Sequence, residues 1–172
     1  MFRLQHVEPG KASGKVAEAY GVFPPGMEPA LPMQVMSASP DLAKIMAASL
    51  RYFISHERLD LGFLAMIRYL AARELGYEFC IGFNAGLLKK AGGLDDAMLE
   101  AMAEDPMQAP LEESQKLLLA FVLKALRAPR EVTREEIEAL RGQGWRDSDI
   151  MDAVFHAASM FAPAVLLKAF TD

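Results

Sequence analysis

The stretch that decides the fold is residues 60–93, DLGFLAMIRYLAARELGYEFCIGFNAGLLKKAGG. Apolar residues cover most sides of its first half, residues 61–75, which is typical of a helix buried at the centre of a protein. Gly76 ends this helix, and a second one is expected to run to residues 92–93, where glycine favours a left-handed C-cap. The sequence therefore predicts two packed helices, with the chain's only cysteine, Cys80, near the start of the second.

The rest of the chain is also expected to be helical. No segment alternates apolar and polar residues with period two over a useful length, so the fold class is all-α. Proline, glycine and helix-capping residues divide the remaining sequence into further helical segments. These segments cover residues 15–20, 40–55, 94–105, 111–126 and 133–140, and a last helix begins with Asp147 or Ser148 as its cap and is kinked at Pro163.

Two of these helices carry apolar residues along one side, and we expect those of the last helix to face inward, because an amphipathic helix packs its apolar side on the core. One stripe lies on residues 40–55 and the other on the last helix. The members are Leu42, Ile45, Met46, Leu50 and Phe53 in the first, and Ile150, Met151, Val154, Phe155, Ala158 and Phe161 in the second.

Residues 1–36 differ from the rest because they are rich in proline and methionine and contain one short helical segment. We expect them to form an N-terminal arm, followed by a single helical domain over residues 37–172. The start of the chain has no apolar run, so no signal peptide is expected.

The domain contains a faint internal repeat with an offset of 52 residues. Residues 92–102 align with residues 144–154, and an apolar helical segment precedes each. In this register Val132 stands opposite Cys80. The sequence therefore predicts two related helical hairpin units, with any thiol chemistry confined to the first.

The composition excludes several classes of protein. A net charge of -5 argues against a nucleic-acid partner, which requires a basic surface. The longest uncharged apolar stretch, Ala153–Leu167, is shorter than the roughly 20 residues of a membrane span, so no membrane partner is expected. One cysteine cannot form an internal disulfide, so we expect a cytoplasmic location. His6, His56 and His156 have no metal-ligand spacing, so neither metal nor cofactor is expected.

The segment from Tyr77 to Asn84, YEFCIGFN, resembles the AhpD-like, or carboxymuconolactone decarboxylase-like, superfamily. Peroxidase members carry the motif Glu-x11-Cys-x2-Cys-x3-His, followed by a small-residue helix that ends in Ala-Gly, as Ala91-Gly92 does here. The resemblance covers most of the chain and points to the peroxidase-related branch. It implies an AhpD-like helical fold and assembly into a homotrimer or homohexamer.

The same resemblance shows which parts of the motif have changed. Cys80 falls on the second cysteine, which is expected to attack peroxide. Tyr77 stands at the first cysteine, Ala65 at the glutamate and Asn84 at the histidine. The resolving thiol, the acid–base carboxylate and the histidine relay are therefore absent.

Two interpretations of Cys80 remain open. Free cysteines are commonly small buried apolar residues with a structural role. Alternatively, the position near a helix N-terminus lowers the thiol pKa and favours the reactive thiolate, while the neighbouring Phe79 and Ile81 oppose this by desolvation. A reactive Cys80 would need an external thiol reductant, because the chain supplies no second thiol.

Tyr77, Cys80 and Asn84 share one helix face at positions i, i+3 and i+7, so a phenol, a thiol and an amide meet there. Arg68 interrupts an apolar stripe of the preceding helix and must reach solvent or pair. The expected pocket residues are Tyr77, Asn84, Arg68 and His156, with Cys80 as nucleophile, Glu74 as candidate base, and Glu74 or Glu78 as partner of Arg68.

Three functions follow from these residues. The first is a single-cysteine alkylhydroperoxidase-like oxidoreductase with an antioxidant role. The second is a non-catalytic relative that binds a small ligand or serves as a structural oligomer. The third is a decarboxylase or related lyase, for which only Arg68, Arg73 and His156 could hold a carboxylate.

Overall fold

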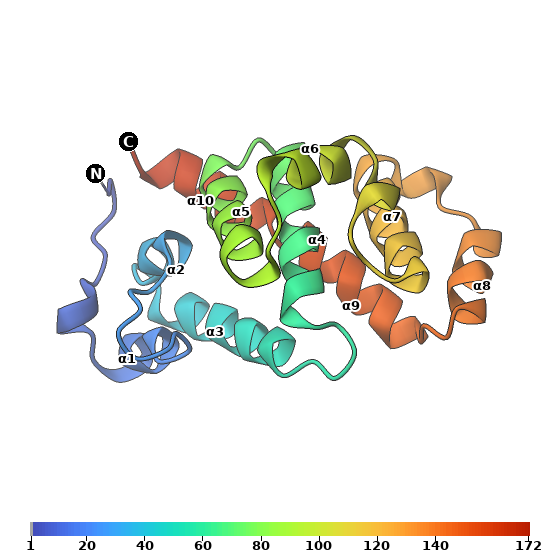
Figure 1. Ribbon diagram of the computed structural model, residues 1–172. Coiled ribbons are helices and arrows are strands. Elements are labelled where there is room, and N and C mark those ends of the chain that lie inside the picture. The colour runs from blue at the N-terminus through green and yellow to red at the C-terminus, as the bar shows by residue number, and fades with distance from the viewer. Residues whose placement is uncertain (1) are drawn as a thin grey trace. The chain divides into compact units, whose positions relative to one another are not determined.

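The computed structural model describes residues 2–172, and within them the all-α class is confirmed (Figure 1). Extended pairing among these residues is limited to an isolated bridge between Phe2 and Thr171. The helices are α1 Gly14–Tyr20, α2 Leu31–Met36, α3 Pro40–Ile54, α4 Leu61–Glu74, α5 Glu78–Gly92, α6 Asp96–Glu104, α7 Glu113–Arg127, α8 Arg134–Gly142, α9 Asp147–Ala158 and α10 Phe161–Phe170, with short 3-10 turns at Pro9–Lys11, Pro106–Gln108 and Pro129–Glu131.

The chain divides into two compact units. Unit 1 contains the residues up to Glu57 together with Ala162–Asp172, and unit 2 is Arg58–Phe161. The boundary expected at residue 36 lies inside unit 1, because α1 and α2 pack on α3.

The core of unit 1 forms where α1 and α2 meet α3. Ala43 and Ala47 are fully buried on α3, whereas Leu42 and Ile45 are exposed. The apolar side of residues 40–55 is therefore only partly turned to the core. Alanine lets the neighbouring helices approach α3 closely, and the larger side chains of α1 and α2 fill the core. These core residues are Val16, Ala19, Tyr20, Met33 and Met36.

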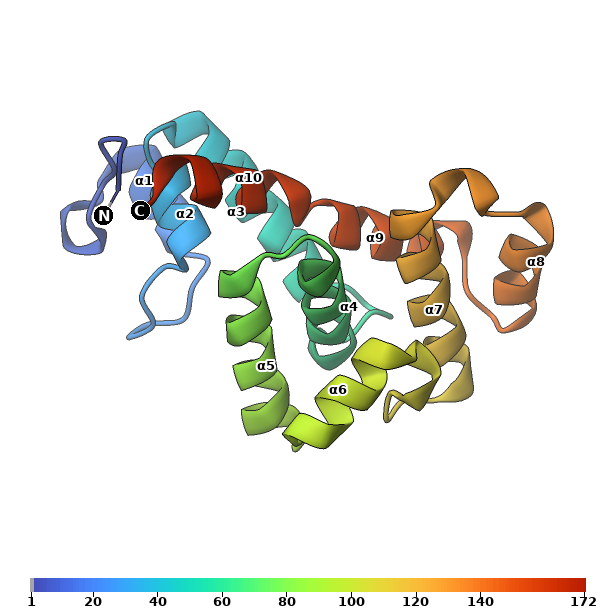
Figure 2. The same cartoon turned by 90° about the horizontal axis from the view of Figure 1, so that it is seen from above.

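Helix α4 is the centre of unit 2, as its apolar sequence predicted. Figure 2 shows α4 between α5 and α7, and contacts join it to α5, α7 and α9. The Asp60 carboxylate caps α4 by accepting a hydrogen bond from the Phe63 amide at 2.9 Å. The buried side chains cover most of the helix surface and include Phe63, Leu64, Ile67, Tyr69, Leu70 and Ala72.

Unit 2 contains the two expected hairpin units, α4–α5–α6 and α7–α8–α9. We call them the first half and the second half. Helices α4 and α7 begin 52 residues apart, at Leu61 and Glu113. Each half also turns in a similar way after its second helix, because the Leu88 carbonyl accepts the Leu94 amide and the Leu140 carbonyl accepts the Trp145 amide, both at 3.2 Å.

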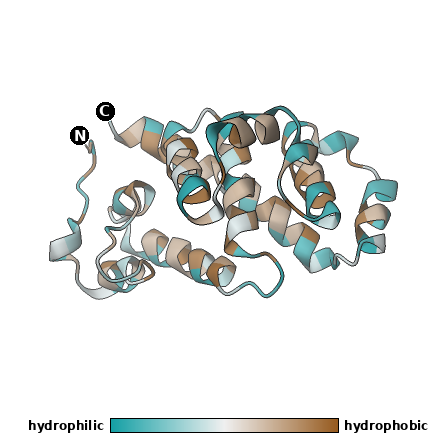
Figure 3. Cartoon of the chain, in the orientation of Figure 1, coloured by the Kyte–Doolittle hydropathy of each residue, from teal (hydrophilic) through white to brown (hydrophobic). Residues whose placement is uncertain are grey.

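The two halves differ in their second helix. Helix α5 has 15 residues and packs along α4. Its counterpart α8 has only 9 residues and follows the 3-10 turn Pro129–Glu131. Figure 3 shows α8 largely in teal, since most of its residues are polar. The second half therefore covers its first helix less completely.

Helix α9 presents a different side to the core than its apolar stripe predicted. Met151, Phe155 and Phe161 are 68%, 55% and 61% exposed, so the expectation that they face inward was wrong. Asp149 and His156 lie on the buried side, because they bond to groups elsewhere in unit 2.

The ends of α9 also differ from expectation. The N-cap is Arg146, whose amide donates to the Asp149 carboxylate at 2.9 Å, instead of Asp147 or Ser148. After Ala158 the helix is broken before α10, where Pro163 has no amide hydrogen to continue the pattern.

By length and composition alone, Asp147–Phe170 could cross a membrane, a criterion that core helices of soluble proteins also meet. Within this stretch, Asp149 and His156 are buried.

Candidate functional site

Three helices of unit 2 bring together the residues expected to line a pocket. Arg68 comes from α4, Cys80 and Asn84 from α5, and His156 from α9, while Tyr77 is the N-cap residue of α5. We call these five residues the Arg68 cluster. A guanidinium, a thiol, an amide, an imidazole and a phenol thus meet in one part of the unit.

Hydrogen bonds through the guanidinium hold the cluster together. Arg68 Nε donates to Asn84 Oδ1 at 2.9 Å, and Arg68 Nη1 lies 3.0 Å from His156 Nε2. Arginine has only donors, so Nε2 must be the acceptor and the imidazole is neutral with its proton on Nδ1. His156 therefore positions Arg68 and is not a proton donor toward it.

Asn84 is fully buried in a helix that is otherwise mostly apolar. Its side-chain oxygen accepts from Arg68, and its side-chain nitrogen donates to the Cys80 carbonyl at 2.8 Å. Both ends of the amide are therefore used, as a buried polar group requires. Asn84 links the charge on α4 to the backbone of α5 next to the cysteine.

Arg68 has no carboxylate partner among residues 2–172. Burial lowers its pKa to about 10, so it remains a cation at neutral pH. The carboxylates expected to pair with it lie elsewhere: Glu78 is exposed, and Glu74 accepts a hydrogen bond from Arg127 at 2.5 Å. A partly buried cation without a counter-charge is costly. The group best placed to supply a negative charge is Cys80, which interacts electrostatically with Arg68.

Cys80 is 8% exposed. Burial raises its pKa above the ordinary value, while the Tyr77 hydroxyl and the Arg68 charge act in the opposite direction. The effect of burial is the largest, so the helix N-terminus does not produce the low thiol pKa that its position favoured. At neutral pH the sulfur is predominantly a thiol.

Tyr77 lies beside this sulfur, and burial raises the pKa of its hydroxyl. The hydroxyl makes no hydrogen bond of ordinary geometry with the described residues, yet it is close enough to the thiol to favour the thiolate. Tyr77 is therefore a neutral phenol that can donate a hydrogen bond to a negatively charged sulfur.

Glu74, the candidate base, is directed away from this chemistry. Its hydrogen bond from Arg127 lowers the pKa of the carboxyl group, which makes it a weaker base. The groups that affect the thiol pKa are Tyr77 and Arg68, and no carboxylate is among them. The structure thus brings Arg68, Asn84 and His156 to Cys80 but not Glu74.

A second feature of unit 2 was not expected from the sequence. A groove of about 400 Å³ lies between α7, α8 and α9, and its lining includes Val132, the counterpart of Cys80 in the repeat. A smaller cavity of about 230 Å³ lies between α7 and α8. Neither is lined by Cys80. The 52-residue offset was the signal that could have directed attention to Val132.

Comparison with known proteins supports the fold. A peroxidase-related protein of uncharacterized function from Silicibacter sp. TM1040 has a TM-score of 0.69 and 20% identity, covering 80% of this chain and 72% of its own. The AhpD-core peroxidase-related protein from Ralstonia eutropha JMP134, also uncharacterized, has a TM-score of 0.79 and 19% identity, covering 98% and 90%. The chain has the AhpD-like fold.

This likeness confirms the architecture that the Cys80 segment implied. No protein-family model matches the sequence, and no curated protein matches it. At 19–20% identity, the likeness to these two solved structures shows the fold of this chain but not its chemistry. The function must therefore be argued from the Arg68 cluster itself.

Proposed function

We propose that this AhpD-like protein is a single-thiol oxidoreductase that reduces a hydroperoxide at Cys80 and is regenerated by an external thiol. The supporting observation is the state of Arg68, a partly buried cation with no carboxylate partner among residues 2–172. Asn84 and His156 fix its orientation, so its charge is available to an anion at the sulfur. Such an arrangement stabilises a thiolate and the charge that develops as peroxide is cleaved.

The chemistry balances with one thiol. The Cys80 thiolate attacks the terminal oxygen of the hydroperoxide, the O–O bond breaks, and the sulfur becomes a sulfenic acid while the alkoxide takes up a proton and leaves as an alcohol. A first external thiol then displaces water and forms a mixed disulfide with Cys80. A second external thiol attacks the reductant sulfur of that disulfide, which releases the Cys80 thiol and an external disulfide.

The residues of the Arg68 cluster have distinct roles in this proposal. Arg68 stabilises negative charge on the sulfur and the attacked oxygen. Tyr77 donates a hydrogen bond to the thiolate. Asn84 and His156 are positioning residues, because they act on the sulfur only through Arg68 and the α5 backbone.

The test compares the native chain with Cys80→Ser. With hydroperoxide and dithiothreitol, the native chain is expected to consume peroxide and the variant is not. Alkylation by iodoacetamide supplies an independent readout, because Cys80 is the only thiol. The proposal fails if the native chain consumes no more peroxide than Cys80→Ser at any pH up to 9.

A second candidate is a non-catalytic relative that keeps the fold for ligand binding or assembly. The burial of Cys80 and the raised pKa of its thiol favour it. It predicts that Cys80→Ser folds and assembles like the native chain and that neither consumes peroxide.

Self-association fits either function. Met151 and Phe161 expose large apolar side chains on the same helical region of unit 2. Exposed apolar patches mark interaction surfaces, so we expect a homo-oligomer, a trimer or a hexamer. Light scattering at micromolar concentration is the measurement, and a monomer would contradict this expectation.

A further inference from the structure

Tyr77 has a hydrogen-bond donor that is unused beside the sulfur of Cys80. Tyr77 is 2% exposed, and its hydroxyl has no hydrogen-bond partner among residues 2–172. A buried polar group without a partner is costly, and most such groups in proteins have one. The unused phenol therefore indicates that the site gains an acceptor in another chemical state.

Arg68 adds further donors to the same place. A guanidinium carries five N–H groups. One of them donates to Asn84 and one to His156, so the other three have no acceptor within the part of the chain that the structure describes. These two bonds also hold the guanidinium where its charge acts on Cys80. The sulfur is therefore surrounded by more donors than the reduced site can use.

The reduced sulfur is a poor partner for these donors. At neutral pH Cys80 is predominantly a thiol, because burial raises its pKa, and a thiol sulfur is a weak acceptor. An oxygen bonded to the sulfur is a better acceptor, and rotation about the Cβ–Sγ bond lets it face the donors. Oxidation to the sulfenic acid adds only this one heavy atom to a residue that is 8% exposed. It is therefore the smallest change that supplies the acceptor.

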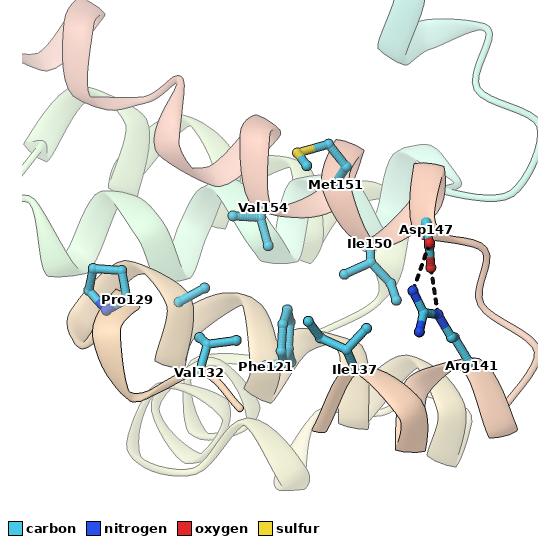
Figure 4. A pocket seen from close by; sticks show the side chains of 10 residues that line it. Phe121, Pro129, Val132, Ile137, Arg141, Asp147, Ile150, Met151 and Val154 are labelled. Carbon is cyan, nitrogen blue, oxygen red and sulfur yellow. Dashed lines mark hydrogen bonds and ion pairs between the residues drawn. The ribbon is translucent and has the colours of Figure 1, made fainter. Parts of the chain in front are cut away.

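The second half shows the same positions without the sulfur. The residues that stand 52 positions after Arg68, Tyr77 and Cys80 have no polar side-chain group, and they are Ala120, Pro129 and Val132. Figure 4 shows Pro129 and Val132 among the side chains that line the apolar groove. In this repeat the donors thus occur in the half that has the thiol, as expected if they serve the sulfur and not the helical fold.

We propose that Cys80 persists as a sulfenic acid after a hydroperoxide has oxidised it, because the added oxygen accepts hydrogen bonds from Tyr77 and Arg68. This modification rests on the proposed function and deepens it. With hydrogen peroxide, the sulfur bonds to one peroxide oxygen and loses two electrons, the O–O bond breaks, and the other oxygen leaves as water with the thiol proton. The chain has no second thiol, so the oxidised form accumulates until an external thiol reduces it.

A chemical trap measures the sulfenic acid. The protein is treated with hydrogen peroxide, freed of the excess, and denatured at set times in dimedone, which reacts with sulfenic acids and not with thiols. Denaturation ensures that burial does not limit labelling, and mass spectrometry gives the labelled fraction of Cys80. Cys80→Ser gives the background from the 11 methionines, which peroxide also oxidises. We expect the label on Cys80 to persist until dithiothreitol is added.

Tyr77→Phe tests the phenol, because it removes the hydroxyl and keeps the ring. We expect dithiothreitol to reduce the sulfenic acid of this variant about tenfold faster than that of the native chain, as for the loss of one hydrogen bond to a charged group. The matched control is Tyr69→Phe, since Tyr69 is also buried but its hydroxyl already accepts a hydrogen bond from Arg73. Equal rates in the native chain and Tyr77→Phe, or the same acceleration in Tyr69→Phe, overturn the proposal.

Thermal unfolding supplies a readout that a purely structural role of Tyr77 would not change. In the reduced protein, Tyr77→Phe removes a buried hydroxyl without a partner, so the Tm should stay the same or rise. In the peroxide-treated protein, the same change removes a donor to the new oxygen and should lower the Tm by about 4 °C relative to the oxidised native chain. A shift of the same sign and size in both states overturns the proposal.

The outcomes separate this inference from the proposed function. If hydrogen peroxide oxidises Cys80 but the native chain and Tyr77→Phe lose the sulfenic acid equally fast, peroxide reduction stands and the persistent sulfenic acid fails. If hydrogen peroxide leaves Cys80 unoxidised, both proposals fail. Direct conversion of Cys80 to a sulfinic acid, with no sulfenic acid accumulating before it, also overturns the inference.

Discussion

The first and second halves of unit 2 share a similar arrangement of helices, but their equivalent positions differ in polarity. In the first half, α5 covers α4, and the two helices hold Arg68, Cys80 and Asn84, while α9 of the second half adds His156 to the cluster. In the second half, the short helix α8 leaves α7 and α9 partly uncovered, and the same sequence positions line an apolar groove. A duplicated unit can therefore keep its backbone pattern while one copy holds a buried charge and the other an open hollow.

The comparison also shows what each arrangement requires. A buried guanidinium is tolerated only when its donors are satisfied, so Arg68 depends on Asn84 and His156. An apolar groove needs no such partners, and the charged residues that line it, Arg141 and Asp147, bond to each other. The first half should therefore be sensitive to changes of single polar residues, as should the buried polar residues of α9, whereas the residues around the groove should be tolerant.

The largest expected effect is on stability. Asn84→Leu keeps a similar volume but leaves Arg68 Nε without its acceptor, and we expect a loss of about 3 kcal/mol in the free energy of unfolding because a charged donor stays buried. The matched change is Glu136→Leu at the equivalent position of the second half. The loss should be smaller there, because the partly exposed Glu136 loses its bond to Lys124 and its place in the capping box but leaves no charged donor deep in the core. Urea unfolding of both variants measures the difference. Equal losses would contradict the contrast between the halves.

The next effect is on thiol reactivity and uses a reciprocal exchange. Cys80→Val combined with Val132→Cys moves the single thiol from the Arg68 cluster to the groove. Val132 is only partly buried, so a thiol there should have a pKa closer to that of a free cysteine. We expect iodoacetamide to react with it faster at pH 8, because burial raises the pKa of the Cys80 thiol. A slower reaction at position 132 would show that Arg68 and Tyr77 activate Cys80 more than burial suppresses it.

Features that depend on residues close together in the sequence could be predicted, whereas features that depend on contacts between distant residues could not. The left-handed C-cap expected at residues 92–93 is confirmed at Gly93, and the Asp60 cap and the Thr133–Glu136 capping box likewise join residues only three positions apart. The orientation of α9 was wrong because apolar periodicity took no account of His156, which bonds to Arg68, 88 residues earlier in the chain.

The candidate site shows the same limit. Arg68 was expected to pair with a nearby glutamate, but its partners are a neutral amide and a neutral imidazole. Asn84 is a polar residue in a mostly apolar helix, so it needs hydrogen-bond partners where it is buried. Sequence spacing alone could not identify Arg68 as a partner of Asn84, because the two residues lie on different helices.

The third prediction concerns pH. The raised pKa of the Cys80 thiol means that the folded protein holds this proton more tightly than the unfolded chain. Alkylation should therefore accelerate about tenfold per pH unit and reach no plateau below the pKa of a free cysteine, because only the thiolate reacts. By linkage, this group stabilises the fold fully below the pKa of the unfolded thiol and contributes less as pH rises through the folded value.

Arg68→Met separates the influences on that thiol. Removing the cation should raise the thiol pKa further and slow alkylation at pH 8, whereas Arg68→Lys should retain part of the rate. Alkylation quenched at set times and followed by mass spectrometry gives the reaction rate of both variants across pH. An unchanged profile in Arg68→Met would mean that the guanidinium has no influence on the sulfur.

The smallest expected effect tests what the two halves still share. Gly93 and Gly144 both have a positive φ, 69° and 88°, after the second helix of their half. A Cβ at either position would meet no atom within 4 Å, so only the backbone conformation opposes a side chain. Gly93→Ala and Gly144→Ala should therefore each lower the free energy of unfolding by about 1 kcal/mol.

Gly86→Ala is the control for this pair, because Gly86 lies inside α5, has space for a Cβ, and does not have a positive φ. That change should stabilise the protein by about 1 kcal/mol through helix propensity. Equal losses at Gly93 and Gly144 would mean that the duplicated turn keeps the same conformational requirement in both halves. A loss confined to Gly93 would mean that the turn of the second half no longer requires a residue with a positive φ. The two halves would then have only their helices in common.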